Sequence, residues 1–563
     1  MREDYSLIMK QNLISMKVFS LFRKSLFFCS FFLLVMGVIS YWPVLSSINV
    51  INPDAQFILP SLSLISSVKE YFVELLSFKT LDFQPLRDLT FFLDLKIFSV
   101  MGIDLTVIHN LVWWLAGNWF LSKLILNVFP KLEKESAFFL GLGFLVYPLF
   151  SQTIPWGVAR KHLLSFFFSM LLTERWTRER SRFLISDVFF YSFFYACSVL
   201  SQPIAILWPL WALLYLALIK PSLLKSSVKV FFSLWVILLV LGLVNYFYYT
   251  NSSVFLSIYA QKTNEAFEFS DKVLAIGHYT FQLVFPYLLS FNYTLGHYST
   301  LIGLVILVLL SLLLRASKAP LKEVIVWIVF FILPLLVVMT NSKILYDTYL
   351  LIPSVGFLFL LLILSRKVPR FSQNVKFFSL GLLILFWVFT TNKNASLWRD
   401  ELSLAEESFQ NRPSCLTAAT YLRISYEQER KGPTLAKNFF DNFECSEKYE
   451  GKMLINLYTY MFFYEVELSM QERVKRLKMM SPLNFFSHAT LVSFYIREKM
   501  LNEAQLEILE FKRRWKGMKI APEYIPIIAK YINPYCKQTE DQGCIELIKP
   551  FSTQNKKLNL MIQ

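Results

Sequence analysis

Residues 25–45 read SLFFCSFFLLVMGVISYWPVL, an uncharged run made almost entirely of apolar side chains. A helix of about 20 such residues crosses the hydrocarbon core of a bilayer. The run lacks an obvious small-residue cleavage site, and basic residues precede it: Lys10, Lys17, Arg23 and Lys24. These features predict an uncleaved first transmembrane helix with a cytoplasmic N-terminus and an outer first loop, residues 46–95.

The composition extends this prediction to most of the chain. Of 563 residues, 55% are hydrophobic and only 17% charged, which is typical of a polytopic membrane protein and unlike an ordinary soluble or disordered one. The net charge of +16 would suggest nucleic acid in a soluble protein. Here many basic residues lie between apolar runs, where they orient helices. No nucleic-acid partner is therefore expected.

Further apolar runs predict additional helices, at 105–129, 137–155, 162–174, 183–200, 203–219, 230–249, 273–290, 299–315, 323–340, 346–364 and 376–391. Basic linkers separate them: Lys131–Lys134, Arg175–Arg182, Lys220–Lys229, Arg315–Lys322 and Arg366–Arg370. All five linkers can be cytoplasmic only if residues 250–298 stay outside, which makes 273–290 an interfacial or re-entrant helix. The predicted fold is all-α, with about eleven crossings and an outer C-terminal part.

Two domains are expected, a membrane domain at 1–392 and an extracytoplasmic helical domain at 393–563. Ala436 and Ala504 lie 68 residues apart, twice the 34-residue period of tetratricopeptide hairpins. That spacing predicts a repeat domain that binds a partner or acceptor protein, and an unrelated helical bundle is the alternative.

The second domain also holds an even set of four cysteines: Cys415, Cys445, Cys536 and Cys544. Two disulfides in an oxidising compartment such as a periplasm would account for them, with the pairing left open. CxxC-like spacing is absent, so no metal ligand is assigned. No cofactor is indicated, and a divalent metal remains an alternative without a motif to support it.

Seven stretches, in order, resemble bacterial relatives of the transmembrane and tetratricopeptide-repeat O-mannosyltransferases, within the GT-C superfamily of glycosyltransferases. They are Phe83–Thr90 (FQPLRDLT), Ile108–Leu111 (IHNL), Tyr147–Pro148, Gly157–Leu164 (GVARKHLL), Phe285–Tyr293 (FPYLLSFNY), Tyr349–Phe357 (YLLIPSVGF) and Asn394–Asp400 (NASLWRD). Such proteins transfer a sugar from a polyprenyl phosphate to a hydroxyl acceptor on the outer side of the membrane. The resemblance implies the same activity here, in a bacterial inner membrane.

Such a transferase needs an outer carboxylate to accept the proton of the attacking hydroxyl. Asp54, in Ile51–Phe57 (INPDAQF), matches the first-loop acid of the family and is the predicted catalytic base. The family usually has adjacent acids here, whereas this chain has Pro53 in front. The alternative is that Asp54 simply begins a helix, because Pro-Asp is common at such ends.

Cations are needed beside the lipid phosphate that leaves. Arg160, Lys161 and His162 fall in a short outer loop of the predicted topology, where basic residues are least expected from orientation effects alone. A phosphate would account for them, and the fork of an arginine binds two of its oxygens. Arg87 and Lys343 are expected to complete this phosphate-binding surface, and contact with anionic lipid headgroups is the alternative.

Two more residues are secondary candidates. Asp88 follows Arg87 directly, and either an Arg87–Asp88 or an Arg87–Asp94 pair would be structural, with Asp94 favoured for a structural role. His109 lies early in an apolar run, where a hydrogen-bonded packing residue is the usual interpretation and catalysis the less common one.

The chain departs from the family pattern at several polar positions. Gln84 replaces an arginine, Tyr147 and Gln152 replace a histidine and a glutamate, Gln202 falls in place of a Lys-Glu pair, and Thr348 replaces an arginine. These losses of charge leave a second hypothesis open, a non-catalytic scaffold that recruits partners through its outer repeats. A transporter is disfavoured because ionisable residues are few inside the apolar runs.

Overall fold

The computed structural model describes residues 26–46, 67, 69–71, 83–101, 105–251, 269–286, 297–338, 346–366, 373–411, 417, 421, 495, 500, 502–504 and 506–507. Within these ranges the regular elements are helical. The α-helices are α2 (Leu26–Leu45), α5 (Pro85–Met101), α6 (Thr106–Val128), α7 (Lys134–Leu145), α8 (Arg160–Thr177), α9 (Ile185–Ser201), α10 (Trp208–Ile219), α11 (Leu224–Asn251), α13 (Phe269–Val284), α14 (His297–Ala316), α15 (Leu321–Val338), α16 (Pro353–Ser365), α17 (Gln373–Ser396) and α18 (Glu401–Asn411). Short 3-10 turns include η1 (Pro148–Phe150), η2 (Gly157–Ala159), η3 (Pro203–Ala205) and η6 (Asp347–Leu350).

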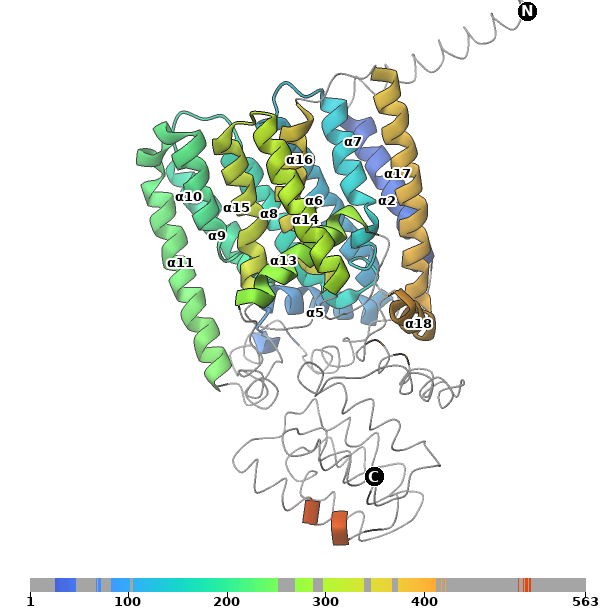
Figure 1. The fold of residues 1–563 in the computed structure, drawn as a ribbon. Helices are drawn as coiled ribbons and strands as arrows, with labels where there is room; N and C mark the ends of the chain where they lie inside the picture. Colours follow the sequence, from blue (N-terminus) through green and yellow to red (C-terminus); the bar gives the residue numbers. More distant parts are fainter. Residues whose placement is uncertain are drawn as a thin grey trace, which may run out of the picture.

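Most of these helices stand side by side in a bundle, and α5 lies across one end of it (Figure 1). Four segments are long and apolar enough to cross a membrane: Thr106–Val128, Pro221–Phe247, Tyr298–Ala316 and Leu321–Val338. The prediction of an all-α protein with membrane-spanning helices is therefore confirmed in this coarse form. Most of residues 412–563 lie outside the described part of the chain, so the repeat domain and the disulfides remain predictions.

The centre of the bundle is packed with aromatic side chains, while its outer faces are apolar and exposed. Trp114, Trp176 and Trp211 are fully or almost fully buried. In contrast, Phe189 on α9 and Phe232 on α11 are 72% and 70% exposed. Apolar side chains on outer helix faces suit a lipid environment, because lipid tails are as apolar as the protein interior.

Several expected helices are shorter than predicted, among them 346–364, where α16 begins only at Pro353 after η6. The run 137–155 was expected to form a single helix, whereas α7 ends at Leu145 and the chain continues through η1 and η2 before α8. Pro148 explains this correction, because the residue before a proline is driven out of helical geometry. The segment between Val146 and Ala159 is instead folded back into the bundle and is buried almost throughout.

Helices α13 and α14 form a tightly packed pair. A Cβ atom on Gly303 would fall 1.7 Å from the carbonyl oxygen of Gly277, so the two backbones touch and only glycine fits. His278 Nδ1 and Ser299 Oγ are 2.8 Å apart across the same contact. The predicted helix 273–290 is observed as α13, which ends just before Pro286, as the restriction on residues preceding proline requires.

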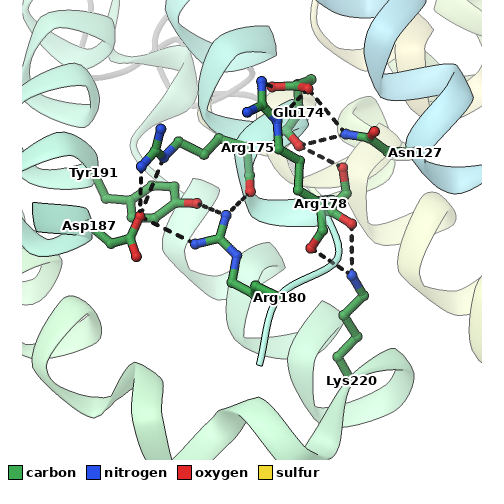
Figure 2. A network of polar contacts seen from close by, with 9 residues as sticks. Asn127, Glu174, Arg175, Arg178, Arg180, Asp187, Tyr191 and Lys220 are labelled. Carbon is green, nitrogen blue, oxygen red and sulfur yellow. Dashed lines mark hydrogen bonds and ion pairs between the residues drawn. The ribbon is translucent and has the colours of Figure 1, made fainter. Parts of the chain in front are cut away.

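The bundle end opposite α5 is held by a network of charged side chains (Figure 2). Arg178 contacts both carboxylate oxygens of Glu174, at 2.8 and 2.9 Å, and Asp187 pairs with Arg175 at 3.0 Å. Lys220 donates to the carbonyl oxygens of Thr177 and Arg178 at the C-terminal end of α8. Burial, followed by the charge of Arg180, lowers the pKa of Lys220.

This network places several of the basic linkers together. Lys220, between α10 and α11, contacts the end of α8, and Arg366, at the end of α16, pairs with Glu323 at the start of α15, at 2.9 Å. Arg366 also lies over the ring of Phe129, which follows α6. The described parts of the five basic linkers therefore gather at the end of the bundle away from α5 (Figure 1).

Candidate functional site at the α5 end of the bundle

Helix α5 begins at Pro85 and packs against α8 and α9 at the end of the bundle. Proline is favoured at the first position of a helix because its missing N–H would have no partner there. Arg87 and Asp94 are seven residues apart, so they share one face of the helix. Both are buried, at 2% and 4% exposed, whereas Lys96 is exposed. The charged face of α5 thus points into the protein.

Arg160, the first residue of α8, is the centre of this site and is completely buried. Its guanidinium lies 2.5 Å from Asp94 Oδ2 on α5 and donates to Asn110 Oδ1 and the Thr106 carbonyl oxygen on α6, at 2.8 and 3.0 Å. It also covers the ring of Phe91. One arginine therefore joins α5, α6 and α8, and a buried charge of this kind is tolerated only with such a set of partners.

Two neighbours of Arg160 extend the network. His109 Nδ1 also contacts Asp94, on its other carboxylate oxygen, and His109 is partly exposed. Asn110 donates to the carbonyl oxygen of Ile154 at 2.9 Å, in the folded-back segment before α8. Since Asp94 is held by both Arg160 and His109, the predicted structural role of Asp94 matches its contacts, with Arg160 as its partner instead of Arg87.

Arg87 forms the second half of the site. It pairs with Asp88 at 2.7 Å and donates to Gln84 Oε1 at 2.8 Å. Gln84 Nε2 in turn donates to Gln202 Oε1, at the end of α9, at 3.0 Å. Two of the positions at which the sequence departs from the family pattern are therefore in direct contact. Gln84 and Gln202 form a neutral amide pair between the start of α5 and the end of α9.

Lys161 and His162 follow Arg160 on α8. Lys161 is half-buried, whereas His162 is buried with its ring 5.1 Å from that of Tyr349, in an edge-on arrangement. The charges of Lys161 and Arg87 both act on His162, so α5 and α8 bring these three side chains near one another. Asp54 and Lys343 lie outside the described residues, and their roles remain predictions.

The site therefore contains three permanent cations, Arg87, Arg160 and Lys161, against two carboxylates, Asp88 and Asp94. The two arginines are fixed by these acids, and a fixed cation or dipole stabilises a developing negative charge without reorganising. Lys161 is the cation with an accessible side chain. Within the described part of the chain, no group of three His, Cys, Asp or Glu side chains could hold a metal ion.

Sequence reasoning missed Asn110 and the pairing of Gln84 with Gln202. Asn110 lies inside the Ile108–Leu111 stretch but carries no charge, and the amide pair joins residues 118 positions apart. Both positions stood out in the sequence as differences from the pattern it resembles, but nothing there indicated that the two side chains touch.

No protein-family model matches the chain, and no curated protein or solved structure matches it either. Fold and site define an all-helical protein with helices able to cross a membrane and a buried charged cluster at one end of its bundle. The resemblance to GT-C glycosyltransferases stays a prediction.

Proposed function

We propose that this protein is an inverting membrane glycosyltransferase, which moves a sugar from a polyprenyl phosphate to a hydroxyl of a protein or glycan outside the membrane. The observation that carries the proposal is the set of cations and carboxylates gathered where α5 crosses the end of an apolar bundle. A lipid-linked phosphate needs both an apolar surface for its chain and fixed cations for its charge.

In the proposed reaction, the acceptor oxygen attacks the anomeric carbon of the sugar, and the bond from that carbon to the phosphate oxygen breaks. The phosphate leaves with the electron pair and gains negative charge, which Lys161 stabilises within the field of Arg87 and Arg160. Asp54 takes the proton of the acceptor hydroxyl. His162, beside Lys161 and Arg87, contributes to the same phosphate-binding surface.

The proposal includes a topology of eleven crossings: α2, α6 to α11 and α14 to α17, with α5 and α13 at the membrane surface. The clustering of the basic linkers at the end opposite α5 supports a cytoplasmic location for that end (Figure 1). The α5 end and residues 393–563 would then face a bacterial periplasm, where a repeat domain binds the acceptor. Labelling of single cysteines placed in the α8–α9 linker and after Gln563 tests this orientation.

The test of the activity is Asp54→Asn in a strain whose surface glycans or glycoproteins change when the gene is deleted. The expected result is the deletion phenotype with normal amounts of the variant protein in the membrane. Asp82→Asn, in the same loop, is a matched control and should restore the products. Normal products from Asp54→Asn would remove Asp54 as the base.

A second candidate is a scaffold that has lost catalysis and recruits partners through its outer repeats. The neutral contact between Gln84 and Gln202 favours it, because charge has been lost on both sides of one contact. A scaffold should co-purify with a partner through residues 393–563 and leave polyprenyl-phosphate sugars unbound. Turnover of such a donor by the purified full chain would exclude it.

A further inference from the structure

A second group of buried polar side chains, in three segments of the bundle, borders the charged cluster where the ring of His162 meets that of Tyr349. Four of its side-chain atoms have no hydrogen-bond partner although their residues are at most 4% exposed. These atoms are Ser151 Oγ and Gln152 Nε2 after η1, Gln282 Oε1 on α13, and Thr348 Oγ1 in η6. Buried polar groups in folded proteins are nearly always paired, so four such atoms in one region require an explanation.

The three segments are neighbours in space. η6 packs against both α13 and η1, and Tyr147, directly before η1, donates its hydroxyl to the carbonyl oxygen of Leu283 on α13. Asp347 in η6 acts electrostatically on Tyr279, one turn before Gln282 on α13. The segments that carry the four atoms therefore meet at one junction between α13, η1 and η6.

The chemistry of the junction is neutral and rich in hydrogen-bonding groups. Gln152 offers an amide N–H, Gln282 an amide oxygen, and Ser151 and Thr348 hydroxyls that can donate or accept. Burial raises the pKa of the neighbouring Tyr279, so its hydroxyl stays protonated. An anion would meet Asp347 nearby without a cation among these four groups. A neutral ligand bearing several hydroxyls matches the set, whereas a phosphate does not.

One side of the junction is formed by α13, which belongs to a tightly packed helix pair. α13 packs chiefly on α14, through the close contact of Gly277 with Gly303 and through His278 with Ser299. Its contacts with η6 and the rest of the bundle are fewer. A small displacement of the α13–α14 pair would therefore uncover the four polar groups without breaking a helix.

We propose that the junction of α13, η1 and η6 is a binding site for the sugar itself, a neutral hexosyl group, and that the α13–α14 pair closes over it. This deepens the proposed function and rests on it for the identity of the ligand. The site adjoins the cationic cluster through the contact of Tyr349 with His162 but uses other side chains, so sugar and phosphate would be recognised by different, neighbouring residues.

The experiment uses the purified full chain in lipid nanodiscs and two probes, farnesyl phosphate and farnesyl phosphate carrying glucose, mannose or N-acetylglucosamine. The variants are Gln152→Leu, Gln282→Leu and Thr348→Val, which remove the unpaired polar groups with little change of volume. Gln84→Leu is the matched control, because Gln84 has partners in the structure. Both thermal unfolding and probe binding are measured.

Wild-type protein should bind at least one sugar-bearing probe about tenfold more tightly than farnesyl phosphate, a ratio that corresponds to about 1.4 kcal/mol. The three variants should bind the sugar-bearing probe no more tightly than farnesyl phosphate. Their affinity for farnesyl phosphate should equal that of wild type. Without ligand they should unfold at the same or a higher temperature than wild type, since an apolar side chain replaces an unpaired polar one. Gln84→Leu should unfold at a lower temperature.

Two results would overturn the inference. Lower unfolding temperatures for the three variants would mean that structural water satisfies these groups and that no ligand is needed. Equal affinity of wild type for the probes with and without sugar would mean that the junction does not recognise the sugar. A failure of the proposed function is separate, because it would appear as absent binding of farnesyl phosphate as well.

Discussion

Replacing Asp94 with asparagine should destabilise the protein strongly, because it leaves the buried charge of Arg160 without its carboxylate. Arg160 is 0% exposed and its guanidinium lies 2.5 Å from Asp94 Oδ2. Removing one partner of a buried ion pair costs about 3–5 kcal/mol. The hydrogen bonds from Arg160 to Asn110 and Thr106 remain, so we expect a value near the lower end, about 3 kcal/mol.

The matched control removes a carboxylate in the same way from a partly exposed pair. Glu323 pairs with Arg366 at 2.9 Å, but the two side chains are 28% and 38% exposed. Exposed pairs contribute about 0–1 kcal/mol, so Glu323→Gln should have a small effect. Equilibrium unfolding of the purified proteins in one detergent, followed by tryptophan fluorescence, measures the loss of unfolding free energy for Asp94→Asn and for Glu323→Gln.

A double variant separates the charge from the packing. Asp94→Leu with Arg160→Met replaces the whole pair by apolar side chains and should recover most of the loss, because neither desolvated charge remains. Equal losses for Asp94→Asn and Glu323→Gln would refute the reasoning. So would a double variant that is as unstable as Asp94→Asn.

Three further predictions use other contacts. Gly303→Ala should cost about 1–3 kcal/mol by overpacking the α13–α14 contact, whereas Gly242→Ala, with open space around it, should be neutral or slightly stabilising in the same unfolding assay. Gln84→Leu should lower the free energy of unfolding by about 1–3 kcal/mol, because it leaves the buried amide of Gln202 unpaired. Adding Gln202→Leu to this variant should restore much of the lost stability, and a double-mutant cycle measures the coupling between the two residues. Burial, reinforced by Asp88, raises the pKa of Tyr71, whose hydroxyl donates to Pro85. The stability that Tyr71 contributes is therefore present below pH ~10 and is lost as the pH rises further. Unfolding midpoints between pH 8 and 11 should fall more for wild type than for Tyr71→Phe, and parallel curves would contradict this.

The helices themselves could be predicted from the sequence because a long apolar run carries its own signal. Thr106–Val128 and Leu321–Val338 were expected within a few residues, at 105–129 and 323–340. Local chemistry also explains why the predicted helix 137–155 was too long, since Pro148 ends α7 early. Helices and their ends depend on residues that are neighbours in the chain, so they can be predicted from the sequence.

The site was predicted only in part. Arg87, Arg160 and Lys161 were recognised as unusual cations, and the structure brings them to one end of the bundle. The Arg87–Asp88 pair was one of two pairs expected from the sequence and is observed, whereas the partner of Arg160 was not foreseen, because its contact with Asp94 depends on how α5 lies across α8. The orphaned groups of Gln152 and Thr348 likewise became visible only when their segments were placed together.

The most direct test of the central claim is the affinity of the purified full chain for farnesyl phosphate, compared between Lys161→Ala and Lys134→Ala. Lys161 lies in the cluster at the α5 end, and Lys134 is an exposed cation at the start of α7, at the opposite end of the bundle. We expect Lys161→Ala to weaken binding about tenfold, equivalent to about 1.4 kcal/mol, and Lys134→Ala to leave it unchanged. Binding that is unaffected by Lys161→Ala, or weakened equally by both variants, would contradict a phosphate site at the α5 end.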